Sequence, residues 1–284
     1  MRLAVLAATL TLGACSAEAP APADTPAPVV LVTEIPRAPV QPRSNPGADA
    51  TLDLDGIVER GIVRVLVTRS GTHFFPYEGG YAGRAVDTGV ALARAISARS
   101  GKIVQAVFVE THEPNLIPHL LAGKGDVAAN LLLTFARDEQ VAFAPPIRTG
   151  IRELIVTPEN EPLRTLEDVG TRTIYVRDGS DHHASLVRLN EQLRKAGRSP
   201  ARIELAVPPV TDEQLLQRVH EGHIPATLAD DYIYDRQRAS LPNMHSNPDI
   251  AVSLGGSLSW VTRKDAPQLA AMLKEFFSTH RLTL

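Results

Sequence analysis

The 284-residue chain has a single cysteine, Cys15, which excludes an internal disulfide and any metal site built from several cysteines. Aromatic residues make up only 5% of the chain, and its 29 basic residues nearly balance its 32 acidic ones. Because no long run of Lys and Arg is present to neutralise a phosphate backbone, we expect no nucleic-acid partner. The hydrophobic share, 44%, is typical of folded domains.

The first residues have the features of a targeting segment. The twelve residues 3–14 (LAVLAATLTLGA) are apolar and follow Arg2, but they are too few to cross a hydrocarbon core of about 30 Å. We therefore predict a signal peptide at residues 1–14. The LGAC sequence that ends at Cys15 resembles the lipobox of bacterial lipoproteins. This resemblance implies cleavage before Cys15 and its lipidation, with the protein anchored in the periplasm, and Ser16 favours the outer membrane. The alternative is an ordinary secreted protein with an incidental cysteine.

A proline-rich segment follows the predicted cleavage site. Eight prolines lie between residues 20 and 46 among Ala, Val and Thr, a spacing that prevents a helix and favours an extended chain. We predict a lipidated tether at residues 15–50. At ~3.1 Å per residue it could reach up to roughly 110 Å from the membrane. The folded part is expected to begin near Thr51.

The rest of the chain alternates between strand and helix patterns in two similar halves. We predict strands at 62–68, 103–109, 126–133, 153–156, 173–176, 203–207, 226–229, 250–254 and 258–261, and helices at 52–60, 87–99, 115–125, 181–196, 212–221, 231–240 and 267–280. This order predicts two α/β lobes with largely parallel sheets, and a ligand cleft where the carboxyl ends of strands meet. Lobe 1 is expected at residues 51–147 and 255–284, and lobe 2 at 148–254.

Several segments in order resemble the type II periplasmic binding fold of the bacterial solute-binding proteins of family 3. They are RGIVRVLVTRS, LLAGKGDVAA, VAFAPPI, TLEDVGTRTIYVRDGS, LLQRVHEGHIPATLADD and SLSWVTRKDAPQLAAMLKEFF, and together the likeness covers residues 52–280. Within that family, VTRSGTHFFPYEGG and EGHIPATLADDYI with HSNPDIAVSLGG resemble the substrate-binding-like module of membrane-bound lytic murein transglycosylase F. The resemblance implies a two-lobed α/β protein whose lobes close on a small ligand.

One pair of candidate ligand-binding residues follows from the T-x-x-R pattern of that family. Thr134 and Arg137 occupy it, and a guanidinium can hold a carboxylate through two parallel hydrogen bonds while a hydroxyl adds a third donor. The structural alternative is that Arg137 pairs with a neighbouring acid on a solvated turn. The family usually has another threonine where this chain has Leu132, so this part of the pocket is expected to differ.

Further candidates lie on the opposite lobe and on the first loop. Asp230 occupies the position of the acid that receives a ligand ammonium group, with Asp231 as the neighbouring competitor and a helix N-cap as the alternative role. Ser180, at the start of a helix, could bind the ligand carboxylate or simply cap the helix. Phe75 and Tyr77 could cover the ligand or pack in the core.

The sequence gives little support for catalysis or metal binding. His182 and His183 are adjacent and His220 and His223 are three apart, but no three-ligand pattern of familiar spacing accompanies them, so we expect no metal and no cofactor. The chain has no G-x-S-x-G motif, no phosphate-binding loop and no Glu-Ser dipeptide like the one that carries the catalytic glutamate of the transglycosylases. We therefore predict a protein that is not an enzyme.

The function predicted from these features is that of a lipid-anchored receptor. It would bind a small zwitterionic or carboxylate-bearing ligand, an amino acid or short peptide, as a monomer and deliver it to an ABC-type permease. The alternative is a muropeptide-sensing module that modulates a cell-wall hydrolase. A third possibility, an enzyme acting in the same cleft, would consume its ligand.

Overall fold

The computed structural model describes residues 49–207 and 209–279. The predicted signal peptide, Cys15 and nearly all of the tether lie outside these residues. Within the described part, no helix combines the length and apolar character that a membrane span requires.

Ten of the strands form one mixed sheet in the order β4-β1-β5-β12-β7-β10-β8-β9, with β6 and β11 pairing at its sides. A separate hairpin is formed by β2 and β3. The strands are β1 (Ile62–Val67), β2 (Phe75–Tyr77), β3 (Gly80–Ala82), β4 (Gln105–Glu110), β5 (Val127–Leu132), β6 (Val141–Phe143), β7 (Arg148–Pro158), β8 (Thr173–Arg177), β9 (Arg202–Ala206), β10 (Thr227–Asp230), β11 (Met244–His245) and β12 (Ala251–Arg263).

Helices cover this sheet on both faces. They are α1 (Leu54–Arg60), α2 (Arg84–Ser100), α3 (Leu116–Leu121), α4 (Phe135–Asp138), α5 (Leu166–Val169), α6 (Asp181–Lys195), α7 (Asp212–His220), α8 (Asp231–Gln237) and α9 (Pro267–Thr279), with a 3-10 turn, η1 (Glu113–Asn115), before α3. The glycines Gly61 and Gly101 end α1 and α2 in the left-handed conformation that glycine adopts at low cost.

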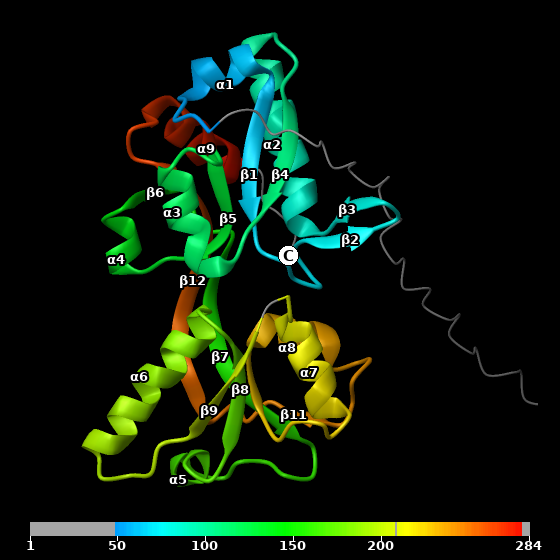
Figure 1. The fold of residues 1–284 in the computed structure, drawn as a ribbon, viewed down its shortest axis with the longest axis vertical. Coiled ribbons are helices and arrows are strands. Elements are labelled where there is room, and N and C mark those ends of the chain that lie inside the picture. Colours follow the sequence, from blue (N-terminus) through cyan, green and yellow to red (C-terminus); the bar gives the residue numbers. More distant parts are fainter. Residues whose placement is uncertain (1–48, 208, 280–284) are drawn as a thin grey trace, which may run out of the picture. The chain divides into compact units, whose positions relative to one another are not determined.

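The apolar side chains form separate cores in two lobes. In lobe 1, α2 and α9 pack on one face of β1, where Trp260 is fully buried against Phe277, and α3 packs on the other face. In lobe 2, one core lies under α6 and another under α7 and α8. Figure 1 shows β7 and β12 running from one lobe into the other. The predicted boundaries at residues 147 and 254 stay predictions.

The sequence patterns located the main elements, but they did not predict the hairpin β2–β3, the short strands β6 and β11, or the short helices α4 and α5, and β7 extends well beyond the predicted 153–156. Two further features differ. The two predicted strands at 250–254 and 258–261 form one strand, β12, whose pairing with β7 shifts register several times. The sheet is also less parallel than predicted. Its outer pairs β1-β4, β1-β5, β8-β9 and β8-β10 are parallel, but β7 and β12 pair antiparallel with each other and with their neighbours. The reason is that these two strands cross between the lobes in opposite directions.

A buried ion pair joins three segments of lobe 1. Arg64 of β1 is fully buried, and its Nη2 donates to Asp126 Oδ1 at 2.9 Å while its backbone N–H donates to Oδ2 at 2.7 Å. Arg60 of α1 also binds the Asp126 carboxylate. The Thr262 hydroxyl of β12 donates to the Asp126 carbonyl at 2.8 Å. Asp126 therefore fixes α1, β1 and β12 around one point.

We expect the substitution Asp126→Asn to lower the free energy of unfolding by about 3 to 5 kcal/mol, because it leaves the buried guanidinium of Arg64 without a counter-charge. Urea denaturation measures this change. A matched control is Glu275→Gln, which breaks the exposed pair with Arg99 and should cost less than about 1 kcal/mol. Equal effects of the two substitutions would contradict the structural role of Asp126.

Candidate functional site

A cavity of about 100 Å³ lies between the two lobes and is lined by both. Its lining residues are mostly polar, and they are Thr68, Arg69, Ser70, His73, Glu113, Asn130, Leu132, Glu153, Arg177, Asp181, His182, Asp212, Glu213, Asp230, Tyr232, Ile233 and Leu258. Pockets that enclose small molecules usually measure about 300 to 1,000 Å³. In this conformation the side chains of the cleft therefore fill most of the space that a ligand would need.

The sheet explains why these residues meet. Most of them lie at or just beyond the carboxyl ends of strands β1, β4, β5, β8, β9 and β10, as predicted for a ligand cleft in α/β lobes. Asn130, near the end of β5, adopts a left-handed backbone with φ 58°, which asparagine tolerates better than most residues. Gly179 also has positive φ, and a Cβ there would lie 2.4 Å from Pro114 of the other lobe. Glycine thus lets the turn before α6 pack on η1.

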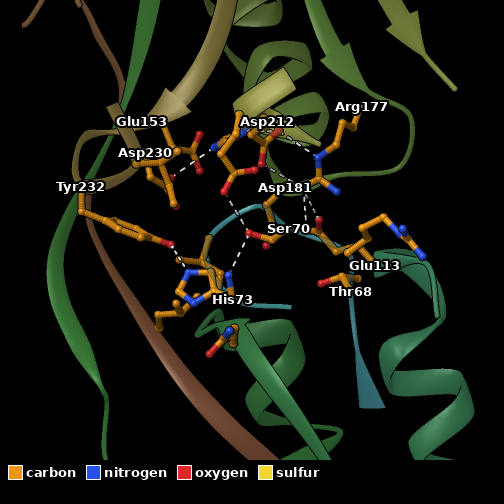
Figure 2. Close-up of a pocket in the computed structure, with 17 residues that line it drawn as sticks. Thr68, Ser70, His73, Glu113, Glu153, Arg177, Asp181, Asp212, Asp230 and Tyr232 are labelled. Atoms are coloured by element: carbon orange, nitrogen blue, oxygen red, sulfur yellow. Dashed lines mark hydrogen bonds and ion pairs between the residues drawn. The ribbon is translucent and has the colours of Figure 1, made fainter. Parts of the chain in front are cut away.

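Arg177 of lobe 2 binds two carboxylates, and one of them, that of Glu113, belongs to lobe 1. Its Nε donates to Asp212 Oδ1 at 2.8 Å, and its Nη2 donates to Glu113 Oε2 at 2.9 Å (Figure 2). Glu113 of lobe 1 also accepts the backbone N–H of Asp181 at 2.9 Å. Burial raises the pKa of Glu113 to about 7 although Arg177 opposes this shift. Burial also raises the pKa of Asp212, but Arg177 and His182 outweigh it and hold that pKa below its usual range.

A second ion pair across the lobes joins Arg137 to Asp181. Arg137 Nη1 and Nη2 donate to the two carboxylate oxygens of Asp181 at 2.9 and 2.7 Å, and Nη1 also donates to the Leu132 carbonyl at 3.0 Å. This is the parallel two-bond geometry in which a guanidinium recognises a carboxylate. The carboxylate in this case comes from the chain itself, at the first residue of α6.

Two further hydrogen-bonding contacts cross the closed interface. The Ser70 hydroxyl donates to Glu213 Oε1 at 3.0 Å, and His73 Nε2 lies 3.1 Å from the hydroxyl of Tyr232 (Figure 2). Arg148 stacks over the Tyr232 ring at 4.5 Å from its centre. Burial lowers the pKa of His73 to about 4, so the imidazole is neutral at pH 7.

Glu153, His182 and Asp230 form a cluster at the lobe 2 side of the cavity. One ligand atom from each lies within 4.8 Å of the others, and His182 Nε2 is 3.2 Å from Asp230 Oδ1. Glu153 is 4% exposed and its Oε2 has no hydrogen-bond partner. Burial raises the pKa of Glu153. Burial lowers the pKa of His182, but the charges of Asp212 and Asp230 outweigh it and raise that pKa well above its usual value. These three side chains are the group that could hold a metal or an amino group.

The charge of the lining favours a cation. It contains six carboxyl groups against three cationic side chains, which are Arg69, Arg177 and His182 with its raised pKa. Arg177 is paired as described, and Arg69 binds Glu110 through two hydrogen bonds of 2.8 Å. The lining residues therefore have negative charge to spare.

Of the residues predicted from the sequence, Asp230 lines the cavity and the others do not. Thr134 caps α4 by accepting the Arg137 N–H, and Arg137 touches the lining residues Leu132 and Asp181. Ser180 is buried and caps α6 by accepting the His183 N–H at 3.2 Å. Phe75 and Tyr77 are half-buried on β2. The assignment of these residues to ligand binding stays a prediction.

Sequence reasoning missed most of the polar lining. His73 stands two residues before the predicted Phe75, and His182 was considered only with histidines close in sequence. Glu153 lies in the middle of β7, where nothing in the local pattern distinguishes it from other strand residues. One available signal was position, because Asp181 and Asp212 are the first helical residues after strands of lobe 2.

The buried neutral His73 should make stability depend on pH. An unfolded histidine binds a proton near pH 6.5, so as the pH falls towards 4 the unfolded state gains a proton that the folded state does not bind, and the free energy of unfolding decreases. At pH 4.5 this loss amounts to about 2 to 3 kcal/mol relative to pH 7.5.

In the variant His73→Gln that contribution disappears. The decrease in unfolding free energy between pH 7.5 and 4.5, measured by urea titration at both values, should therefore be smaller in the variant than in the wild type by the same amount. Identical decreases in the two proteins would show that His73 is not held in its neutral form.

The comparisons with known proteins agree with this geometry. The chain is 27% identical over 209 residues to membrane-bound lytic murein transglycosylase F of Alcanivorax borkumensis, covering 73% of this chain but only 42% of that protein. It is 28% identical to cyclohexadienyl dehydratase of Pseudomonas aeruginosa, covering 62% of each. Its fold matches the solute receptor for L-cysteine of Neisseria gonorrhoeae with a TM-score of 0.65 at 18% identity, over 80% of this chain and 87% of that one.

The two-lobed α/β fold with a polar cleft is the type II periplasmic binding fold. Residues 65–282 match the bacterial extracellular solute-binding proteins, family 3. Because this match spans most of the chain, the protein belongs to the bacterial extracellular solute-binding proteins of family 3.

Proposed function

We propose that the cleft binds a small solute with a free carboxylate and an amino group, such as an amino acid or short peptide, when the lobes open and close. The observation that carries this proposal is the pair between Arg137 and Asp181. Asp181 holds the guanidinium with the same two parallel bonds that a ligand carboxylate would make. A ligand would replace Asp181 on Arg137 while the lobes are apart.

The amino end of the ligand would bind on lobe 2. Asp230 lines the cavity, and the unpartnered Oε2 of Glu153 lies in the same cluster. An ammonium group offers three donors to such carboxylates, and its charge would balance the excess of acidic groups in the lining. The L-cysteine receptor among the structural neighbours supports an amino acid as ligand.

The family and the predicted N-terminal signal suggest the cellular role that we propose. As a lipoprotein anchored through Cys15, the protein would work outside the cytoplasm as a monomer and deliver its ligand to an ABC-type permease.

A second role is favoured by the transglycosylase relatives. This chain resembles 42% of the length of one such protein. A muropeptide also carries free carboxylates and amines, so the same cleft could sense cell-wall fragments and regulate a hydrolase without catalysis of its own. The dehydratase relative makes ligand turnover the third outcome to test.

The substitution Arg137→Ala should weaken ligand binding by roughly thirtyfold or more, about 2 kcal/mol, because the ligand carboxylate loses its counter-charge. Isothermal titration calorimetry with the best ligand measures this. The control is Arg202→Ala, which removes an arginine that is 75% exposed on β9 and should leave affinity unchanged. Unchanged binding in Arg137→Ala would remove Arg137 from the ligand site.

Asp181→Asn should have the opposite effect. If Asp181 occupies Arg137 about 90% of the time in the free protein, removing this competitor strengthens ligand binding about tenfold. The same titration measures the gain. Weaker binding in this variant would contradict the idea that Asp181 takes the place of a ligand carboxylate.

A thermal-shift screen separates the candidate roles. We expect free amino acids to raise the melting temperature, because a ligand that binds only the folded state stabilises it. Stabilisation by muropeptides alone would contradict the uptake role and support the sensing role. Recovery of unchanged ligand after prolonged incubation would exclude turnover.

A further inference from the structure

We propose that Glu153, His182 and Asp230 form a binding site for a divalent transition-metal ion of the Zn²⁺ type on the lobe 2 side of the cleft. The site shares Asp230 with the proposed amino-group site, so the metal would be a second cation that this cleft accepts. It does not depend on Arg137, which would bind the carboxylate group of the proposed ligand.

The spacing of the three donors suits a single ion. Zinc binds imidazole nitrogen at about 2.0 to 2.1 Å and carboxylate oxygen at about 2.0 to 2.2 Å, which places donors of one tetrahedral site roughly 3 to 4 Å apart. His182 Nε2 and Asp230 Oδ1 are already 3.2 Å apart, and all three donor atoms lie within 4.8 Å of one another. Completing a tetrahedral set requires the Glu153 oxygen to approach the other two donors to about 3 to 4 Å.

The burial of the cluster supports a cation there. Glu153 is 4% exposed and His182 is 6% exposed, yet Glu153 Oε2 has no hydrogen-bond partner. A buried carboxylate oxygen without a partner costs free energy, which a proton, water in the cleft or a bound cation can offset. Figure 2 shows Glu153 and Asp230 next to each other at the edge of the cavity.

A further residue would orient the imidazole. His182 Nδ1 has no hydrogen-bond partner in this conformation, but Asp212 Oδ1 lies 3.6 Å from it and Arg177 holds Asp212 in place through a 2.8 Å hydrogen bond, so a small shift would let Asp212 accept from Nδ1. Metal-binding histidines almost always direct their second ring nitrogen towards a carboxylate or carbonyl, which fixes the tautomer that leaves the other nitrogen free for the metal. In this cluster the other nitrogen is Nε2, which faces Asp230.

The donor types select the class of metal. One imidazole with two carboxylates suits zinc and its transition-metal neighbours, whereas Ca²⁺ and Mg²⁺ prefer oxygen ligands alone. Three protein ligands leave a fourth position of a tetrahedral site open. Because Asp230 lines the cavity, that position would face the space between the lobes.

The test is metal titration of the full, untagged chain after treatment with a chelator. We expect one equivalent of Zn²⁺ to bind by isothermal titration calorimetry, and Co²⁺ used as a probe to give the visible absorption of a low-symmetry site. Glu153→Gln and His182→Asn should each weaken Zn²⁺ binding by more than about 100-fold. Replacing a residue that only hydrogen-bonds to a metal ligand typically costs about 10- to 100-fold, and replacing a ligand itself should cost more. Circular dichroism establishes that each variant is folded.

The matched control is His183→Asn, which changes the neighbouring histidine of α6 outside the cluster and should leave Zn²⁺ affinity unchanged. Absence of saturable binding in the wild type, or equal affinities of wild type, Glu153→Gln and His183→Asn, would overturn the proposal. Arg137→Ala separates the two sites, because it should lose the amino-acid ligand and keep Zn²⁺. Zinc binding in a wild-type protein that binds no amino acid or peptide would support the metal site and contradict the proposed function.

Discussion

The ion pairs between the lobes determine what this cleft can do. Arg137 of lobe 1 binds Asp181, and Arg177 of lobe 2 binds Glu113, so each lobe supplies a cation to a carboxylate of the other. These contacts close the cleft with the protein's own charges and leave a cavity of about 100 Å³. Opening the lobes would expose both arginines and both acids to water, where their hydration compensates for the lost pairs.

Because of these ion pairs, the free energy of ligand binding depends on replacing pairs within the protein by pairs with the ligand. A carboxylate-bearing ligand would gain a guanidinium only by separating it from an acid of the same chain, so the net gain is smaller than the contact itself suggests. The excess of carboxyl groups in the lining acts on the opposite end of the ligand, because those groups stabilise any bound cation electrostatically. Recognition of the positive end of a ligand therefore has the larger electrostatic support.

Much of the fold followed from the sequence because hydrophobic periodicity reports local structure directly. The buried run of β1 and the amphipathic α6 are examples, and the strand-end rule located the cleft. The residues of the candidate site were harder to predict from the sequence. Asp230 was found through the family pattern, but no local pattern marks Glu153, whose importance comes from His182 and Asp230 meeting it in space. That Arg137 pairs with Asp181, 44 residues away, also depends on how the lobes meet.

The two strands that connect the lobes each contain a glycine with a left-handed backbone. Gly150 of β7 and Gly255 of β12 both have positive φ, at 71° and 76°, and neither has a neighbouring atom within 4 Å of where a Cβ would stand. Glycine adopts this left-handed backbone at low cost, whereas residues with a Cβ rarely do, even where space is open. A substitution at either position would therefore place backbone strain in a strand that both lobes share.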